Sequence, residues 1–256
     1  MQTDPLWLEC AGLSVVGRRA NNEDAYLLRP NLGLFAVADG MGGYEGGEVA
    51  SATVVAALDS MVAHADVDPD GTWPLRERAG LGPLESLVDV ALRVADREVR
   101  ARRTGVLAKM GSTAAVVLAR GRRLAIGHVG DSRVYRCRER LECMTEDHSV
   151  AAELRRSGIE QRDIAPRFAA CLTRAIGMVE PAVPDVCGDT LLAGDVYLLC
   201  SDGLWGALAD AVIEDILRTS PASDACHALI QAAHDAGSDD NITAVVVRVH
   251  ASRSSR

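Results

Sequence analysis

The chain has 256 residues, of which 48% are hydrophobic and only 4% aromatic, so its core must be built mainly from aliphatic side chains. A formal net charge of −9 argues against a general nucleic-acid or anionic-membrane surface. The seven cysteines are scattered without a Cys-x-x-Cys pair, which argues against a disulfide framework or a structural zinc site and predicts reduced thiols.

The first half of the chain predicts three strands followed by two helices. Apolar runs of strand length, bounded by turn residues, lie at 7–16, 24–28 and 33–38. Five glycines within 40–47 require a loop. Apolar residues at helical spacing then predict helices at 45–64 and 84–103, and the Asp-, Pro- and Gly-rich segment between them predicts a surface loop.

The second half begins with a run of strands. Short turns separate four apolar segments, as in an antiparallel meander: 112–119, 122–129, 132–137 and 141–144. A helix is predicted at 148–158, and irregular chain continues to residue 183. The last predicted elements are strands at 185–191 and 195–200, helices at about 209–218 and 222–236, and a strand at 242–249.

The order of these elements predicts the fold class. Strands come in runs and helices in pairs, unlike the strict alternation of a doubly wound parallel sheet, so we expect an α+β layered fold with antiparallel sheets. We expect a single domain over residues 1–250 and a disordered tail at 251–256. The irregular segment at about 147–183 is predicted to be a flap that determines specificity.

Four short acidic clusters are the most informative feature of the sequence. Each lies at the edge of an apolar run: Glu23-Asp24, Asp39-Gly40, Ser201-Asp202-Gly203 and Asp239-Asp240-Asn241. Carboxylates at strand ends, brought together by folding, are the ligands that Mg²⁺ and Mn²⁺ prefer. The clusters therefore predict a metal site assembled across the fold, with water as the reagent.

Each segment taken alone has a simpler interpretation. Asp39-Gly40 is a common turn dipeptide, although the further glycines permit close approach of a ligand, and the Asp39 carboxylate and Gly40 carbonyl could hold one cation. Glu23 and Asp24 cannot point the same way in a regular strand, so one is expected to reach a metal through water. Gly130 and Asp131, between two strands, are read on spacing alone as a hairpin turn.

Other chemistries lack their sequence patterns. The glycine-rich loop has no Gly-Lys-Ser/Thr, so it is not a nucleotide P-loop, and the acidic segments lack calcium-loop spacing. The six histidines form no pair spaced for zinc. No Gly-x-Ser-x-Gly elbow is present, and no cysteine has an evident base beside it in sequence.

Taken together, seven segments resemble the metal-dependent protein phosphatase family of the 2C type, in its bacterial branch. They occur in the family's order over residues 12 to about 248: Arg-Ala-Asn-Asn-Glu-Asp at 19–24, Asp-Gly-Met-Gly-Gly at 39–43, Gly-Ser-Thr at 111–113, Gly-Asp-Ser-Arg at 130–133, Leu-Thr-Arg-Ala-Ile-Gly at 172–177, Ser-Asp-Gly-Leu at 201–204 and Asp-Asn-Ile-Thr at 240–243. Each match is weak alone, whereas seven in order are highly specific.

The resemblance implies a fold and a set of site residues. The fold would be a four-layer α-β-β-α sandwich, with two mostly antiparallel sheets flanked by helix pairs. Two Mn²⁺ or Mg²⁺ ions would lie at one end of the sheets, and a third site would be formed by Asp131 with Asp202. The remaining roles implied are direct ligation by Asp39, Asp202 and Asp240, a carbonyl ligand from Gly40, ligation partly through water by Glu23 and Asp24, and phosphate binding by Arg19.

The implied reaction is hydrolysis of phosphoserine and phosphothreonine in proteins. A hydroxide bridging the two metals would attack phosphorus in line, without a phosphoenzyme. Arg19 would hold two phosphoryl oxygens with its planar fork. Many eukaryotic members have a histidine where this chain has Met41, which cannot donate a proton, so a metal-bound water is expected to protonate the leaving group, with His148 as a distant alternative.

Two other functions remain open at this stage. A catalytically silent regulator would lack a metal carboxylate, and none is missing here. A hydrolase of small phosphate esters would be distinguished from a protein phosphatase by its relative rates on small esters and on a phosphopeptide. The expected partners are phosphorylated proteins and an opposing Ser/Thr kinase. We expect a cytoplasmic protein, because no apolar stretch has membrane-spanning length and the N-terminus lacks signal-peptide character. A monomer is also expected.

Overall fold

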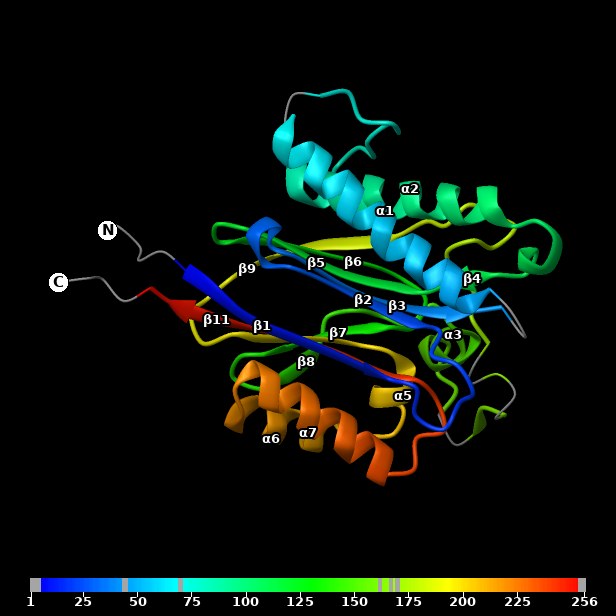
Figure 1. Cartoon of the computed structure of the whole chain (residues 1–256). Coiled ribbons are helices and arrows are strands. Elements are labelled where there is room, and N and C mark those ends of the chain that lie inside the picture. The colour runs from blue at the N-terminus through cyan, green and yellow to red at the C-terminus, as the bar shows by residue number, and fades with distance from the viewer. Residues whose placement is uncertain are drawn as a thin grey trace.

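The computed structural model describes residues 6–42, 46–68, 71–160, 163–165, 168 and 171–252. Two sheets pack face to face, and helices cover the outer face of each, as Figure 1 shows. The predicted four-layer α-β-β-α arrangement is therefore confirmed. Among the described residues, no helix combines the length and apolar character needed to span a membrane.

The first sheet has the strand order β1-β11-β10-β7-β8. Its strands are antiparallel throughout, and their bounds are Leu6–Val15 for β1, Arg133–Cys137 for β7, Leu141–Cys143 for β8, Val196–Cys200 for β10 and Ile242–Ala251 for β11. Helices α5, α6 and α7 lie on its outer face and have the bounds Asp202–Trp205, Asp210–Thr219 and Ala222–Asp235.

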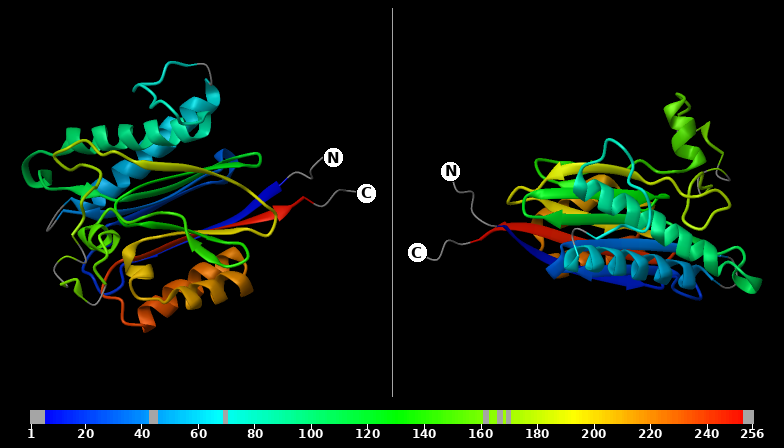
Figure 2. Two further views of the ribbon diagram at one scale, coloured as in Figure 1. Left: turned by 180° about the vertical axis from the view of Figure 1, so that it is seen from behind. Right: turned by 90° about the horizontal axis from the view of Figure 1, so that it is seen from above.

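The second sheet has the order β2-β3-β5-β6-β9, with β4 paired to β3. Its bounds are Asp24–Arg29 for β2, Leu34–Met41 for β3, Gly111–Ser112 for β4, Ala114–Arg120 for β5, Arg123–Val129 for β6 and Asp185–Thr190 for β9. Helices α1 (Gly47–Val67) and α2 (Pro83–Arg102) cover it, and the view from above in Figure 2 shows them side by side over that sheet. Helix α3 (Val150–Arg156) and the 3₁₀ turns Pro30–Leu32 and Gly105–Leu107 complete the described elements.

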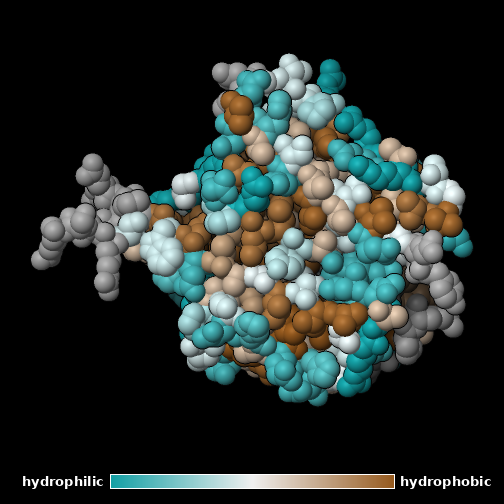
Figure 3. Space-filling view, in the orientation of Figure 1, coloured by the Kyte–Doolittle hydropathy of each residue, from teal (hydrophilic) through white to brown (hydrophobic). Residues whose placement is uncertain are grey.

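Central strands are apolar at nearly every position because both of their faces are buried. Along β3, Leu34 and Ala36 face helices α1 and α2, whereas Phe35 and Val37 belong to the core between the sheets. The edge strands β1 and β2 are mostly half-buried instead. Figure 3 shows that hydrophobic residues reach the surface along this open edge, among hydrophilic ones.

One wrong strand boundary and one helix that was not predicted matter for the site. Strand β3 was expected to end at residue 38 but continues through Asp39 and Gly40 to Met41, because β4 supplies a partner for its last residues. The glycine loop is correspondingly shorter, and residues 43–45 lie outside the described residues. The four-residue helix α5 was not predicted, since Ser-Asp-Gly reads as a turn.

The end of the chain also differs from the prediction. Ala251 was assigned to a disordered tail, but it is the last residue of β11 and pairs with Leu6, because β1 begins early enough to provide a partner. Residues 253–256 lie outside the described residues. The start of β1 and the end of β11 therefore lie at one end of the sandwich. The strand ends next to the acidic clusters lie at the other end (Figure 1).

Candidate metal centre

Asp24 and Asp39 come from neighbouring strands of the second sheet. Asp24 begins β2, and Asp39 lies opposite it in the antiparallel register of β2 and β3. The backbone of Asp39 is fixed from the other side, since its N–H donates to Thr113 Oγ1 at 3.0 Å and its carbonyl accepts from Ser112 Oγ at 3.0 Å. Residues directly opposite in such a pair share one face, so both carboxylates point to the same place.

Asp202 and Asp240 come from the first sheet. Asp202 begins α5 immediately after β10, and Asp240 precedes β11, which pairs with β10. A Cβ on Gly203 would lie 2.0 Å from the carbonyl oxygen of Asn241, so glycine permits this close approach of the two segments. Both carboxylates are thereby held at the same end of the sheet.

Hydrogen bonds join the two sheets at this point. Asp24 Oδ2 accepts from Ser201 Oγ at 2.7 Å and from Thr243 Oγ1 at 2.5 Å. Asn241 adds a second link, because its Oδ1 accepts from the backbone N–H of Glu23 at 2.8 Å. The sequence analysis assigned no role to Ser201, Asn241 and Thr243, although they lie within the recognised motifs. Their position next to Asp202 and Asp240 was the one feature of the sequence that could have indicated a supporting role.

Asp131 belongs to the same site, although its spacing alone indicated a hairpin turn. It follows β6 and is buried, with 8% of its surface exposed. Its charge raises the pKa of Asp39, and together with Asp202 and Asp240 it lines a hollow of about 480 Å³. We call Asp24, Asp39, Asp131, Asp202 and Asp240 the carboxylate cluster.

Burial dominates the electrostatics of the carboxylate cluster. It raises the pKa of Asp24 and of Asp131 to about 7, with further contributions from neighbouring carboxylates. Burial and four other carboxylates raise the pKa of Asp39 well above its usual value. Burial and the charge of Asp240 also raise the pKa of Asp202, although a hydrogen bond with Asp39 opposes that rise. Without a counter-charge, the ionised cluster is therefore strained.

The cluster fits a hard divalent cation. Its donors are all carboxylate oxygens, the type that Mg²⁺ and Mn²⁺ prefer. Within the described part of the chain, Asp24 Oδ1 and Asp202 Oδ1 are buried side-chain oxygens with no hydrogen-bond donor. Such atoms are costly unless a partner satisfies them, and a bound cation would provide that partner.

Arg19 lies at the rim of the cluster. Its Nη2 donates to Asp240 Oδ2 at 2.6 Å, and its Nε donates to the carbonyl oxygen of Asp239 at 3.1 Å. The side chain is 56% exposed, so an incoming anion can reach the guanidinium. The position is consistent with the predicted phosphate-binding role.

Glu23 and Gly40 are the chain neighbours of Asp24 and Asp39. Glu23 points toward the start of α1, where a Cβ on Gly47 would lie 2.5 Å from its carboxyl carbon, and burial raises its pKa. Gly40 donates its N–H to the Glu23 carbonyl at 3.1 Å. A Cβ on Gly40 would meet the Gly47 carbonyl at 2.1 Å, so no larger residue fits. Ligation by the Gly40 carbonyl and by Glu23 stays a prediction.

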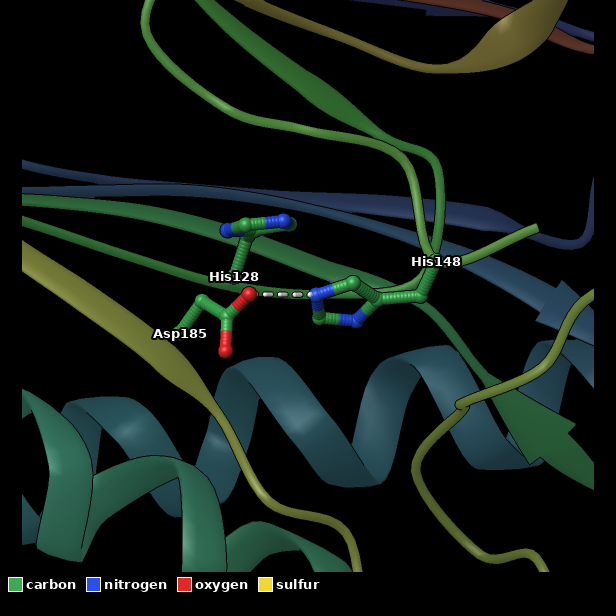
Figure 4. Close-up of side chains that lie close together, drawn as sticks. All are labelled: His128, His148 and Asp185. Atoms are coloured by element: carbon green, nitrogen blue, oxygen red, sulfur yellow. Dashed lines mark hydrogen bonds and ion pairs between the residues drawn. The ribbon is translucent and has the colours of Figure 1, made fainter. Parts of the chain in front are cut away.

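A second group of metal-ligand side chains lies elsewhere in the fold. His128 of β6, His148 and Asp185 of β9 bring their ligand-type atoms within 4.8 Å of one another. Figure 4 shows the three side chains together. The sequence gave no hint of this group because its members are far apart along the chain. His148 Nε2 lies 3.0 Å from Asp185 Oδ2 and the side chain is only 1% exposed, which does not support His148 as the proton donor to a leaving group.

The chain is similar in sequence to known protein phosphatases. A family model described as protein phosphatase 2C matches residues 10–242. The serine/threonine protein phosphatase PstP of Mycobacterium tuberculosis is 35% identical over 240 residues, which cover 90% of this chain but 43% of that protein, so the chain spans less than half of that relative. The protein phosphatase PhpP of Streptococcus pneumoniae is 30% identical over 95% of this chain and 98% of its own length.

Solved structures give the same assignment. The catalytic domain of PstP in complex with two manganese ions superposes with a TM-score of 0.80 at 36% identity, covering 96% of this chain and 99% of that one. The serine/threonine phosphatase of S. agalactiae has a TM-score of 0.81 at 29% identity, covering 94% and 99%. Both the sequence match and the fold therefore place the chain in the protein phosphatase 2C family.

Proposed function

We propose that the chain hydrolyses phosphoserine and phosphothreonine in proteins, with Mn²⁺ or Mg²⁺ bound in the carboxylate cluster. The observation that carries the proposal is the convergence of five carboxylates from both sheets, with orphaned buried oxygens, beside an accessible guanidinium. The names and the manganese-bound structure of the relatives support it.

Asp39, Asp202 and Asp240 would hold two ions, helped by the Gly40 carbonyl and, partly through water, by Glu23 and Asp24; Asp131 with Asp202 would hold a third. Since both hydroxyl donors to Asp24 occupy one oxygen, only its Oδ1 is open toward a cation or its water. When bound, such ions supply an activated water and positive charge for phosphoryl transfer. Arg19 would orient two phosphoryl oxygens, as a bidentate guanidinium can.

The two nucleophilic side chains that precede Asp202 in the chain are not available for attack on phosphorus. Ser201 Oγ is buried and donates to Asp24, and the fully buried Cys200 has its thiol pKa raised by burial. Neither is available to form a phosphoenzyme, which supports direct attack by water.

The test is turnover of a phosphothreonine peptide by Asp39→Asn and Asp240→Asn, with Mn²⁺ and Mg²⁺ supplied separately. Loss of a direct ligand should lower kcat more than about 100-fold, because even indirect supporting residues account for 10- to 100-fold. Asp239→Asn is the matched control, as its side chain is exposed and only its carbonyl contacts Arg19. Unchanged hydrolysis in Asp39→Asn or Asp240→Asn would refute the proposal.

Comparing the peptide with a small aryl phosphate at equal metal concentration separates a protein phosphatase from a hydrolase of small esters. An opposing Ser/Thr kinase, a cytoplasmic location and a monomeric state stay predictions.

A further inference from the structure

The hydrogen bonds around His148 determine where its proton lies. The backbone N–H of Gly130 donates to His148 Nδ1 at 3.1 Å, so Nδ1 carries a lone pair. The proton is therefore on Nε2, which donates to Asp185 Oδ2 at 3.0 Å (Figure 4). Burial lowers the pKa of His148 to about 4, which keeps the ring neutral near pH 7 and consistent with this single proton.

This proton placement argues against a metal site at His128, His148 and Asp185. A cation on His148 Nε2 would have to displace the proton and leave an imidazolate, because Nδ1 is already an acceptor. Asp185 is also engaged by Arg174, whose Nη1 and Nη2 donate to its two oxygens at 2.9 and 3.1 Å. A guanidinium in this position repels a second cation.

His148 instead holds the segment that carries Asp131. Besides accepting from the Gly130 N–H, it donates its own backbone N–H to the Gly130 carbonyl at 2.9 Å. Gly130 has φ of 101°, and a Cβ there would lie 2.6 Å from the Thr113 side chain, so the backbone has a narrowly defined path. The next residue is Asp131 of the carboxylate cluster.

The other side of Asp131 is held independently. Trp205 Nε1 donates to the Asp131 carbonyl at 2.9 Å, and the Arg133 guanidinium lies 3.4 Å from the centre of the indole ring. Arg133 in turn makes two 2.8 Å bonds to Asp147, the residue before His148. Loss of the His148 contact should therefore loosen Asp131 on one side without unfolding the segment.

We infer that His148 is a positioning residue that fixes the Asp131 carboxylate through Gly130, and that Asp185, oriented by Arg174, fixes the His148 tautomer. If Asp185 did not accept from Nε2, the proton could move to Nδ1 and oppose the Gly130 N–H. The His148 carbonyl also accepts from the Thr173 N–H at 2.8 Å. A later residue of the predicted flap is therefore hydrogen-bonded to His148 as well. The inference rests on the proposed function insofar as Asp131 is taken as a cation ligand.

Two substitutions of His148 separate its two contacts. His148→Asn keeps an acceptor at the position of Nδ1 but cannot reach Asp185, whereas His148→Gln places its amide near Asp185 and leaves the Gly130 N–H without an acceptor. Calorimetric titration of the full chain with Mn²⁺ is the measurement, and Asp131→Asn identifies the site that depends on Asp131. At that site we expect about 10-fold weaker affinity in the Gln variant and an unchanged affinity in the Asn variant.

A second pair of variants tests the tautomer and guards against misfolding. Asp185 is 51% exposed, so changes there are tolerated more readily than in the buried ring. Asp185→Asn retains an acceptor for Nε2–H and should preserve both Mn²⁺ affinity and the ¹⁵N shifts of an Nε2-protonated His148. Asp185→Ala should lower the affinity and shift the ring toward mixed tautomers.

Equal Mn²⁺ affinities for the Asn and Gln variants of His148, or for both variants of Asp185, would overturn the inference. It would also fall if Asp131→Asn left the number of bound ions unchanged. Neither result would touch the proposed function, which fails only if Asp39→Asn or Asp240→Asn retains turnover.

Discussion

Asp24 and Asp39 lie directly opposite each other across the β2–β3 pair, so two buried carboxylates share one face of the sheet. Like charges in this relationship destabilise a strand pair unless something neutralises them. The surrounding structure fixes them in place, through two hydroxyls on Asp24 and through residues 112 and 113 around Asp39. A site of this kind gives up stability in the absence of a cation, and that cost can be measured.

Asp39→Asn should stabilise the protein in chelator, because it removes the carboxylate whose pKa is raised by burial and by four neighbours. Mn²⁺ should reverse the order, since saturation at about 100 times Kd adds about 2.7 kcal/mol to the wild type and less to the variant. Thermal unfolding with and without Mn²⁺ measures both effects. A variant that unfolds below the wild type in chelator would contradict this account of the site.

The carboxylate cluster should make the metal-free protein less stable as the pH rises from about 4 to about 7, against an opposite contribution from His128 and His148, whose pKa values are lowered by burial. Burial raises the pKa of Asp24 and Asp131 from 3.8 to about 7, so the folded state binds more protons than the unfolded chain in this window. Their contribution is fully present below pH 4 and is lost as the pH passes 7. Urea unfolding across this range in chelator measures the slope, and excess Mn²⁺ should flatten it. Because Asp131→Asn removes one of these carboxyl groups and leaves both histidines, its slope in chelator should be less negative than that of the wild type, and equal slopes would be inconsistent with a protonated Asp131.

Arg19→Lys should lower kcat/KM for a phosphopeptide roughly 10- to 100-fold, the equivalent of one charged hydrogen bond of about 1.5–3 kcal/mol. Lysine keeps the charge but lacks the planar fork that engages two oxygens. Because the side chain is 56% exposed, stability should change little. Steady-state kinetics beside thermal unfolding would show this, with Arg18→Lys as the neighbouring control. Full activity in Arg19→Lys would show that Arg19 contributes only its positive charge and not the bidentate geometry of its guanidinium.

Asp147→Ala should cost about 3–5 kcal/mol of stability, because it leaves the Arg133 guanidinium in a buried site without its bidentate partner. The preceding residue supplies the control. Glu146 pairs with Arg156 at 2.7 Å, but both side chains are more than half exposed, so Glu146→Ala should cost less than about 1 kcal/mol. Similar losses in chemical denaturation would show that burial does not distinguish the two pairs.

Much of the fold was predictable because local patterns depend on burial. Strands such as β3 and β10 are apolar at successive positions since both faces are covered, and α1 and α2 carry apolar faces at helical spacing. The predictions failed where a distant partner decides the outcome. Met41 belongs to a strand because Gly111 of β4 pairs with it. Ala251 belongs to a strand because Leu6 of β1 pairs with it.

The sequence by itself determined the candidate ligands, since a carboxylate at the end of an apolar run is a local feature. The seven motif segments, taken in order, identify the family. Only the tertiary structure decided how they are used. It placed Asp131 in the cluster despite its turn-like spacing. It also set the hydrogen bonds from Ser201 and Thr243 to Asp24, and those of His148 with Gly130 and Asp185. These contacts span tens to hundreds of residues, and no local pattern encodes them, because hydrogen-bond partners are selected by distance in space rather than along the chain.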